Sequence, residues 1–165
     1  MRVLAIDPGF GRCGVAVLDG DASSSHILYS TCIETDAKNK FVDRLCVVAN
    51  EVLKLIREFN PELVAIEELF FSNNQKTVFH VAEVRGVLMY LAASHNLPLV
   101  EYNPMAIKIA VTGYGKAKKQ DVIKMVTKLT DIKKVPTHDD EYDAIALGVT
   151  ALSGARISAI QKSFA

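Results

Sequence analysis

Several features that would place a protein in a special class are missing from this sequence. Its three cysteines, Cys13, Cys32 and Cys46, are odd in number and widely spaced, which argues against a disulfide framework or a zinc cluster, so we expect buried thiols. No apolar run approaches the roughly 18 residues of a membrane span, and the N-terminal MRVLAIDPGF lacks a signal-peptide layout. We therefore expect a cytoplasmic protein that does not contact a membrane.

The formal net charge is zero, because 19 Lys and Arg residues balance 19 Asp and Glu residues. Overall charge therefore does not attract nucleic acid, and any such binding depends on where the charges lie. Between residues 108 and 134, lysines clearly outnumber acids. These lysines are Lys108, Lys116, Lys118, Lys119, Lys124, Lys128, Lys133 and Lys134. They form either a surface for nucleic acid or an ordinary solvated helix face.

What is present is typical of one globular domain. With 50% hydrophobic residues and no repeat or linker, we expect a single domain over residues 1–165, with a tail after about residue 155 that extends the last helix or frays. The hydrophobic patterns predict strands at 1–7, 11–19, 26–35, 61–68 and 97–102, and helices at 39–59, 76–96, after Asn103, at 119–129 and at 140–154. This order resembles the ribonuclease H-like fold, an α/β fold with a mixed five-stranded sheet flanked by helices.

Four acidic residues stand where hydrophobic segments end or begin. Asp7 follows MRVLAI, Glu67 follows LVAI, and Asp140 and Asp143 open the last predicted helix, where a spacing of three puts them on one face. In the expected fold the first and fourth strands are adjacent, so the four acids can meet in one pocket. Such a cluster repels itself until divalent cations bridge it, which points to phosphoryl chemistry at a metal site.

Each acid also has a simpler explanation. Asp7 can merely begin an Asp-Pro-Gly turn, Glu68 can face the pocket in place of Glu67, and acids at a helix start can serve only as caps. The glycines of IDPGFGRCGVAV allow either another backbone or a phosphate to approach closely. Because the phosphate loop of the actin-like superfamily shares this pattern, an ATP-dependent phosphotransferase is an alternative function.

Two segments carry large apolar side chains whose partners are not evident. The helix around residues 78–93 is apolar on more than one side, with Val84 in one row and Met89 beside it. Its second face predicts either a twofold homodimer or burial under other helices of the same chain. Phe70 and Phe71 lie in a polar-flanked loop, where they either pack in the core or dimer seam or contact unstacked bases.

In combination these segments resemble the RuvC family of Holliday (four-way) junction resolvases. The likeness runs through IDPGFGRCGVAV, IEELFFSNNQKTVFHVAEVRGV, LPLVEYNPMAIKIAVTGYGKAKKQDV and DEYDAIALGV, with the same order and spacing over nearly the whole chain. It implies a homodimeric, magnesium-dependent endonuclease that nicks two strands of like polarity symmetrically across a junction, in homologous recombination and DNA repair. It also implies partnership with the RuvAB branch-migration complex.

The resemblance assigns roles to individual residues. The family's four catalytic acids and metal ligands fall on Asp7, Glu67, Asp140 and Asp143. Its junction-contacting phenylalanine falls on Phe70 and its two functional lysines on Lys108 and Lys119, with Lys116 and Lys118 nearby as further DNA contacts. We expect two Mg²⁺ ions about 4 Å apart, bridged by Asp7, with Mn²⁺ able to substitute. Lys119 is then expected to stabilise developing charge, and Lys108 to contact a neighbouring DNA arm.

Some positions depart from the family pattern. Glu141 and Tyr142 stand where many members have two alanines, with His138 and Asp139 just before them, and this denser acidity can alter metal binding. The loop after Phe71 lacks a lysine that related loops commonly carry, so its DNA contacts and the preferred cleavage sequence do not transfer. A junction-binding scaffold without catalysis is a second alternative, against which the presence of all four acids argues.

Overall fold

A computed structural model describes residues 1–21, 23–69, 75–132 and 135–163, with the side chains of 75–77 and 155–163 left out. Its strands are β1 (Arg2–Asp7), β2 (Arg12–Gly20), β3 (Ser25–Glu34), β4 (Leu63–Glu67) and β5 (Leu99–Tyr102). Its helices are α1 (Phe41–Phe59), α2 (Gln75–Ser94), α3 (Pro104–Thr112), α4 (Lys119–Leu129) and α5 (Asp139–Ser163). The predicted elements are confirmed, and α5 continues as helix past residue 154, where the expected helix ended.

The strands form one mixed sheet in the order β3-β2-β1-β4-β5. The first three strands make the predicted antiparallel meander, whereas β4 runs parallel to both β1 and β5. Residue Ile6 of β1 is in register with Ile66 of β4. The next residue along each strand is an acid, so the register alone brings Asp7 and Glu67 to neighbouring strand ends.

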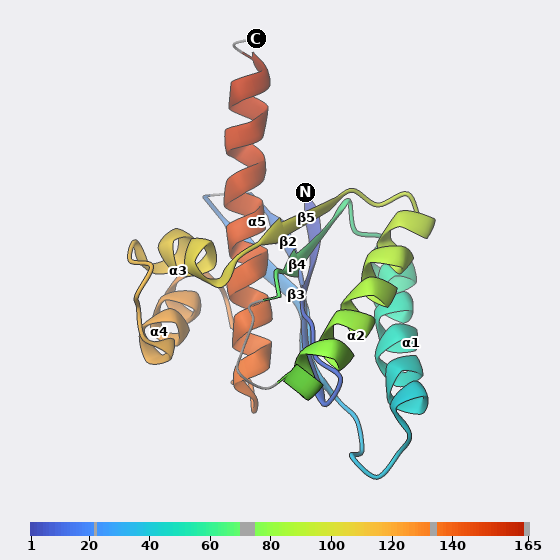
Figure 1. The fold of residues 1–165 in the computed structure, drawn as a ribbon. Helices are drawn as coiled ribbons and strands as arrows, with labels where there is room; N and C mark the ends of the chain where they lie inside the picture. The colour runs from blue at the N-terminus through green and yellow to red at the C-terminus, as the bar shows by residue number, and fades with distance from the viewer. Residues whose placement is uncertain (22, 70–74, 133–134, 164–165) are drawn as a thin grey trace.

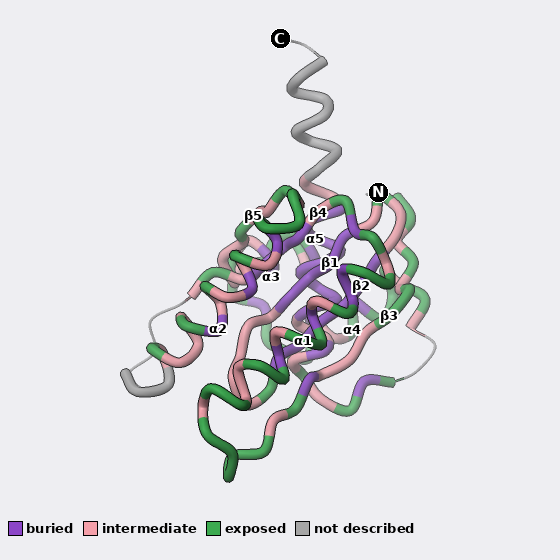
Figure 2. The backbone as a smooth tube through the Cα atoms, turned by 90° about the vertical axis from the view of Figure 1, so that its right-hand side faces the viewer, coloured by how far each residue is buried: buried purple, intermediate pink, exposed green. Residues whose placement is uncertain are grey.

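The sheet separates two hydrophobic layers, because successive side chains of a strand point to opposite faces. Along β1, Leu4 and Ile6 join the layer under α1 and α2, whereas Val3 and Ala5 join the layer under α3, α4 and α5. Figure 1 shows α1 and α2 on one side of the sheet and the other three helices on the opposite side. Buried residues follow the central strands and the inner faces of the helices (Figure 2).

Helix α5 lies so close to the sheet that two contacts leave no room for a side chain. A Cβ added to Gly14 of β2 would stand 1.9 Å from the carbonyl oxygen of Asp140. A Cβ added to Gly148 of α5 would stand 2.4 Å from a methyl group of Leu18. The expectation that a glycine of IDPGFGRCGVAV lets another backbone approach is thus confirmed at Gly14, where the start of α5 docks on β2.

Helix α3 is fixed at both ends by local chemistry. The side chain of Asn103 accepts a hydrogen bond from the backbone N–H of Ala106 at 2.8 Å, and Pro104 occupies the first turn, as the sequence predicts. Gly113 ends the helix with a φ of 77°, a left-handed conformation that glycine adopts without strain. These caps fix where the helix that carries Lys108 begins and ends.

The expectation of buried thiols is only partly right. Cys13 is buried in β2, Cys32 is intermediate, and Cys46 is exposed on α1, where its position on the helix turns it to solvent. Burial raises the pKa of the Cys13 thiol to about 12, so this thiol is inert. Among the residues with described placement, no helix is both long enough and apolar enough to cross a membrane.

Candidate active site

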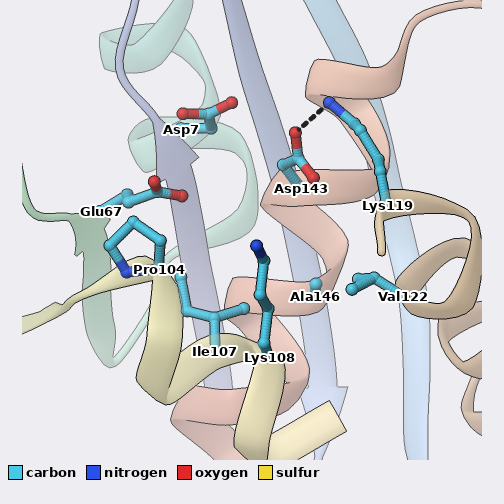
Figure 3. Close-up of a pocket in the computed structure, with 9 residues that line it drawn as sticks. All are labelled: Asp7, Glu67, Pro104, Ile107, Lys108, Lys119, Val122, Asp143 and Ala146. Carbon is cyan, nitrogen blue, oxygen red and sulfur yellow. Dashed lines mark hydrogen bonds and ion pairs between the residues drawn. The ribbon is translucent and has the colours of Figure 1, made fainter. Parts of the chain in front are cut away.

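Three acids from three segments line one cavity at the ends of β1 and β4. Asp7 and Glu67 occupy odd positions on their strands, as do Ala5 and Ala65, so all four face the α5 side of the sheet. Asp143 approaches from the first turns of α5, and the three carboxylates point toward a shared space (Figure 3). The cavity measures about 230 Å³. Its lining residues are Asp7, Glu67, Pro104, Ile107, Lys108, Lys119, Val122, Asp143 and Ala146.

Asp140, the fourth predicted acid, lies beside this cavity and does not line it. Its Oδ2 atom is 3.3 Å from Nε of Arg12, yet this buried oxygen accepts no hydrogen bond. The Asp140 carboxylate still acts electrostatically on Asp7, whose pKa it helps to raise. All four acids therefore interact electrostatically, but only Asp7, Glu67 and Asp143 line the cavity.

The cluster is unfavourable when all its carboxylates are ionised. Burial, followed by the charges of Glu67, Asp143 and Asp140, raises the pKa of Asp7 to about 8 against the opposing effect of Lys119. Burial and the charge of Asp143 raise the pKa of Glu67 to about 7. The pKa of Asp143 is also raised, mainly by burial. Such shifts mean that the folded protein stores repulsion that an added cation relieves.

Lys119 supplies a positive charge at the mouth of the cavity. Its ammonium group donates a hydrogen bond to Asp143 at 2.8 Å and lies 2.7 Å from Oδ2 of Asp139. Burial alone would lower the pKa of Lys119, but the hydrogen bonds to Asp139 and Asp143 outweigh it and raise that pKa. Lys108 enters the same space from α3, with its ammonium group directed at the carboxylates (Figure 3).

The residues fit a divalent cation in donor type and in charge. Carboxylate oxygens are the ligands that Mg²⁺ prefers, and the cluster combines mutual repulsion with a buried Asp140 Oδ2 that accepts no hydrogen bond. Within the described residues, however, no three His, Cys, Asp or Glu side chains are grouped closely enough to enclose an ion in this conformation. Mg²⁺ retains several of its own waters, so one or two carboxylates on an open wall suffice to anchor it.

Three further acidic or histidine candidates near the site, Glu68, His138 and Glu141, lie outside the acidic cluster. Glu68 is exposed, as strand alternation requires once Glu67 faces the cavity. His138 lies 3.0 Å from Glu34, away from the cavity, and the nearly buried Glu141 accepts a hydrogen bond from Ser30 at 2.6 Å. Neither residue therefore joins the acidic cluster.

The other predicted DNA contacts have mixed outcomes. Lys116 and Lys118 are exposed on the turn that leads into α4, where they flank the cavity without lining it. Phe70 lies outside the described residues, so its predicted contact with DNA stays a prediction.

Two residues at the site were not singled out as functional from the sequence. Arg12 reaches both Asp140 and Asp139, at 3.3 and 3.8 Å, and Asp139 in turn pairs with Lys119. The signal for Arg12 is its place in the glycine-containing turn after Asp7, and the signal for Asp139 is the charge density of its segment. Neither signal specifies a partner, because the pairing depends on how α5 docks.

Comparison with known proteins gives a consistent match. A sequence model described as "Crossover junction endodeoxyribonuclease RuvC" matches residues 3–151. The protein of that name from Finegoldia magna is 40% identical over 156 residues, covering 94% of this chain and 95% of its own length. The one from Fusobacterium nucleatum is 36% identical over 160 residues, covering 96% of this chain and 84% of its own length.

Solved structures agree with the sequence matches. The structure described as "T. thermophilus RuvC in complex with Holliday junction substrate" superposes with a TM-score of 0.90 at 30% identity, covering 96% of each chain. The yeast mitochondrial Holliday junction resolvase Ydc2 superposes with a TM-score of 0.66 at 16% identity, covering 92% of this chain and 77% of its own, a likeness that concerns the fold alone. The ribonuclease H-like fold predicted from the order of elements is thereby confirmed.

Proposed function

The chain belongs to the RuvC family of crossover junction endodeoxyribonucleases, and we propose that the cavity formed by Asp7, Glu67 and Asp143 is the place where it cuts DNA. It is a metal-dependent endonuclease that resolves Holliday junctions, with the roles in recombination and DNA repair typical of that family. The observation that carries the proposal is the convergence of three acids and two lysines, from five different elements, on one cavity of about 230 Å³.

Each residue has a role that follows from its position. Phosphodiester hydrolysis needs a water in line with the leaving oxygen and a way to offset the negative charge that grows on the phosphorus centre. Two Mg²⁺ ions, which Mn²⁺ can replace, supply both when bound. Asp7 lies between Glu67 on one side and the α5 acids on the other, so it would be the central metal ligand, and Glu67, Asp140 and Asp143 would complete the set.

The lysines act on the phosphate side of the reaction. Lys119 stands at the cavity mouth, where its ammonium group stabilises charge on the scissile phosphate. Lys108 lies in the same cavity, so it contacts the phosphate backbone at the cut rather than a distant arm. Lys116 and Lys118 extend the positive surface along the α3–α4 turn. Phe70 remains the proposed contact to the junction centre.

At Gly14 the structure favours this function over an ATP-dependent phosphotransferase. The space above Gly14 is filled by the backbone of Asp140, so this glycine receives a helix of its own chain and leaves no room there for a nucleotide phosphate.

Cleavage of defined DNA substrates tests the proposed function. With Mg²⁺ we expect paired nicks at symmetric positions on a four-way junction and at least about tenfold slower cleavage of linear duplex, because the substrate is recognised by its branched shape. The measurement uses end-labelled strands of a mobile and an immobile junction with chelator controls. Equal cleavage of duplex and junction would refute structure selectivity, and junction binding without any cleavage would favour the scaffold.

We further propose that the protein is a homodimer assembled on helix α2. Phe79 and Tyr90 are 71% and 69% exposed, and the intervals between Phe79, Glu83, Gly86 and Tyr90 place all four on one helical face. A Cβ added to Gly86 meets nothing within 4 Å among the described residues, so a second α2 can approach there closely. A twofold dimer presents one cavity to each of two opposed strands of a junction.

Tyr90→Glu is expected to break this dimer, because a buried aromatic at the centre of an interface typically contributes about 2 kcal/mol or more. Analytical ultracentrifugation should show the dimer dissociation constant rising by about 30-fold or more. Val42→Glu is the matched control, since Val42 is an equally apolar side chain, 63% exposed on the neighbouring α1. Wild-type protein that sediments as a monomer at micromolar concentration would contradict the proposal.

We also propose where the protein acts and with which partner. Junction resolution takes place where the chromosome is, which places the protein in the cytoplasm of a bacterial cell. We also propose that it works with the RuvAB branch-migration complex, because cleavage of a mobile junction at a preferred sequence requires that sequence to be moved to the crossover.

A further inference from the structure

Asp139 is an acid of α5 to which the proposed reaction assigns no role. Its carboxylate lies 2.7 Å from the ammonium group of Lys119 and 3.8 Å from Nη1 of Arg12. Asp139 does not line the cavity, and its side chain is 47% exposed. Asp139 is thus well placed to hold Lys119 but not to hold a metal ion inside the cavity.

Lys119 has two acidic partners, Asp139 and Asp143, and in the proposed function Asp143 also binds the metal. In this structure the ammonium group lies 2.8 Å from Asp143 and 2.7 Å from Asp139. Asp143 is a proposed metal ligand, and a carboxylate that coordinates a cation offers less negative charge to a neighbouring ammonium group. When the metal is bound, Asp139 remains as the charged partner of Lys119. A lysine has a long flexible stem, so without that partner its ammonium group samples many positions.

Arg12 fixes Asp139 from the other side. The guanidinium group of Arg12 lies between Asp139 and Asp140, with its Nε 3.3 Å from Asp140 Oδ2 and its Nη1 3.8 Å from Asp139 Oδ1. The chain of charges therefore runs from Arg12 through Asp139 to Lys119, and it connects the turn after Asp7 with the start of α4. This arrangement leaves the Lys119 ammonium group at the cavity mouth in a defined place.

We infer that Asp139 is a positioning residue that holds Lys119 over the scissile phosphate during cleavage. The inference rests on the proposed role of Lys119, which it deepens. Within the described residues, Lys119 pairs with Asp139 and Asp143. If Asp143 binds metal, Asp139 is the acid that holds the lysine in place. Asp139 itself touches neither phosphate nor metal.

A double-mutant cycle tests this inference. Asp139→Asn should lower the single-turnover cleavage rate roughly tenfold with little change in junction affinity, because a misplaced catalytic group loses rate rather than binding. Lys119→Met should lower the rate further. In the Lys119→Met background, Asp139→Asn should have no additional effect, since a residue that acts only through Lys119 has nothing left to position.

A second readout does not depend on activity. In metal-free protein with chelator, Asp139→Asn should lower the melting temperature in the wild-type background and much less in the Lys119→Met background, because the lost ion pair needs both partners.

Glu34→Gln is the matched control for the cleavage measurements. Glu34 pairs with His138 next to the same helix start but contacts neither Lys119 nor the cavity, so the Glu34→Gln variant should cleave at the wild-type rate.

Some outcomes would contradict only the role of Asp139, and another would also contradict the role of Lys119. Equal loss of rate on Asp139→Asn in both backgrounds would overturn the inference alone and leave Lys119 catalytic. A rise in the Mg²⁺ concentration for half-maximal cleavage that persists in the Lys119→Met background would also overturn it, by making Asp139 a metal ligand. Cleavage by Lys119→Met at the wild-type rate would remove both the inference and the proposed role of Lys119.

Discussion

Asp7→Asn is expected to reduce junction cleavage by roughly 1,000-fold or more while leaving junction binding intact. In the proposed function Asp7 would hold the metal, which would contribute several kcal/mol to the transition state, and each 1.4 kcal/mol corresponds to a factor of ten in rate. Asp7 has this position because it ends β1 between Glu67 and the α5 acids. The measurement is single-turnover cleavage beside a gel-shift assay in calcium or chelator. Nicking at the wild-type rate would remove Asp7 from the mechanism.

The same substitution should make the metal-free protein more stable at alkaline pH. The pKa of Asp7 is about 8 in the folded protein and 3.8 in the unfolded reference, and that of Glu67 is about 7 against 4.5. Between pH 4 and pH 8 the folded state therefore binds more protons than the unfolded state, so the stability of the wild-type protein falls as pH rises through this window. Asparagine removes the largest part of that loss.

Thermal melts in chelator give the size of this effect. At pH 8.5 we expect Asp7→Asn to melt roughly 5 to 10 °C above wild type, because the cost of burying the charge and its repulsion by the other acids together amount to a few kcal/mol. At pH 5 the difference should be much smaller, because folded Asp7 is protonated there and only its ionisation in the unfolded state, where its pKa is 3.8, still lowers the stability of wild type. Added Mg²⁺ should stabilise wild type more than the variant, because it binds the folded state.

Asp19→Asn is the matched control for Asp7→Asn. Asp19 lies at the opposite end of the sheet, in register with Arg2, and its hydrogen bond from Arg2 lowers its pKa, so the sign of its contribution is reversed. Its loss should leave cleavage unchanged and should not raise the melting temperature. A rise for both variants would mean that the stabilisation comes from lower negative charge in general rather than from the cavity.

Gly14→Ala is expected to reduce both stability and cleavage. The new Cβ would stand 1.9 Å from the carbonyl oxygen of Asp140 and 2.6 Å from its carbonyl carbon, so the backbone of α5 has to move. Overpacking of this kind typically costs about 2 to 3 kcal/mol, or roughly 5 to 10 °C in melting temperature. Because the start of α5 carries Asp140 and Asp143, a shift of about 1 Å there should slow cleavage by about 100-fold.

Gly148→Ala is the matched control for Gly14→Ala. Gly148 lies on the same helix and faces the same sheet, but its new Cβ would meet only the end of the Leu18 side chain, at 2.4 Å. We expect a loss of stability of about 1 to 3 kcal/mol with cleavage close to wild type, measured well below the melting temperature. If both variants lose cleavage in proportion to stability, then Gly14 supports the fold in general and does not specifically set the acids.

The parts of the site that lie on strands were predictable from the sequence. Alternation along β4 selects Glu67 over Glu68, and the adjacency of β1 and β4 brings Glu67 beside Asp7; both follow from the period of two along a strand and from the order of elements. The exposed Phe79 and Tyr90 on α2 were not recognised, because the apolar rows of that helix do not say which row meets the sheet.

The parts of the site that lie on α5 were predictable only as a group. Asp139, Asp140, Glu141 and Asp143 are spread around one turn of the helix, so the rotation of the helix about its axis decides which of them faces which neighbour. In the structure Asp143 enters the cavity, Asp140 turns to Arg12, Asp139 to Lys119, and Glu141 to Ser30. The sequence pattern holds no information on that rotation.

By itself, then, the sequence determined the order of strands and helices, the candidate acids and the family, because hydrophobic periods and motif spacing are local properties of the chain. Only the tertiary structure decided which acid meets which cation. That choice depends on the depth and rotation of α5 over β2, which the backbone contact between Gly14 and Asp140 fixes. Such a contact joins residues far apart in the chain, and packing rather than any local pattern sets it.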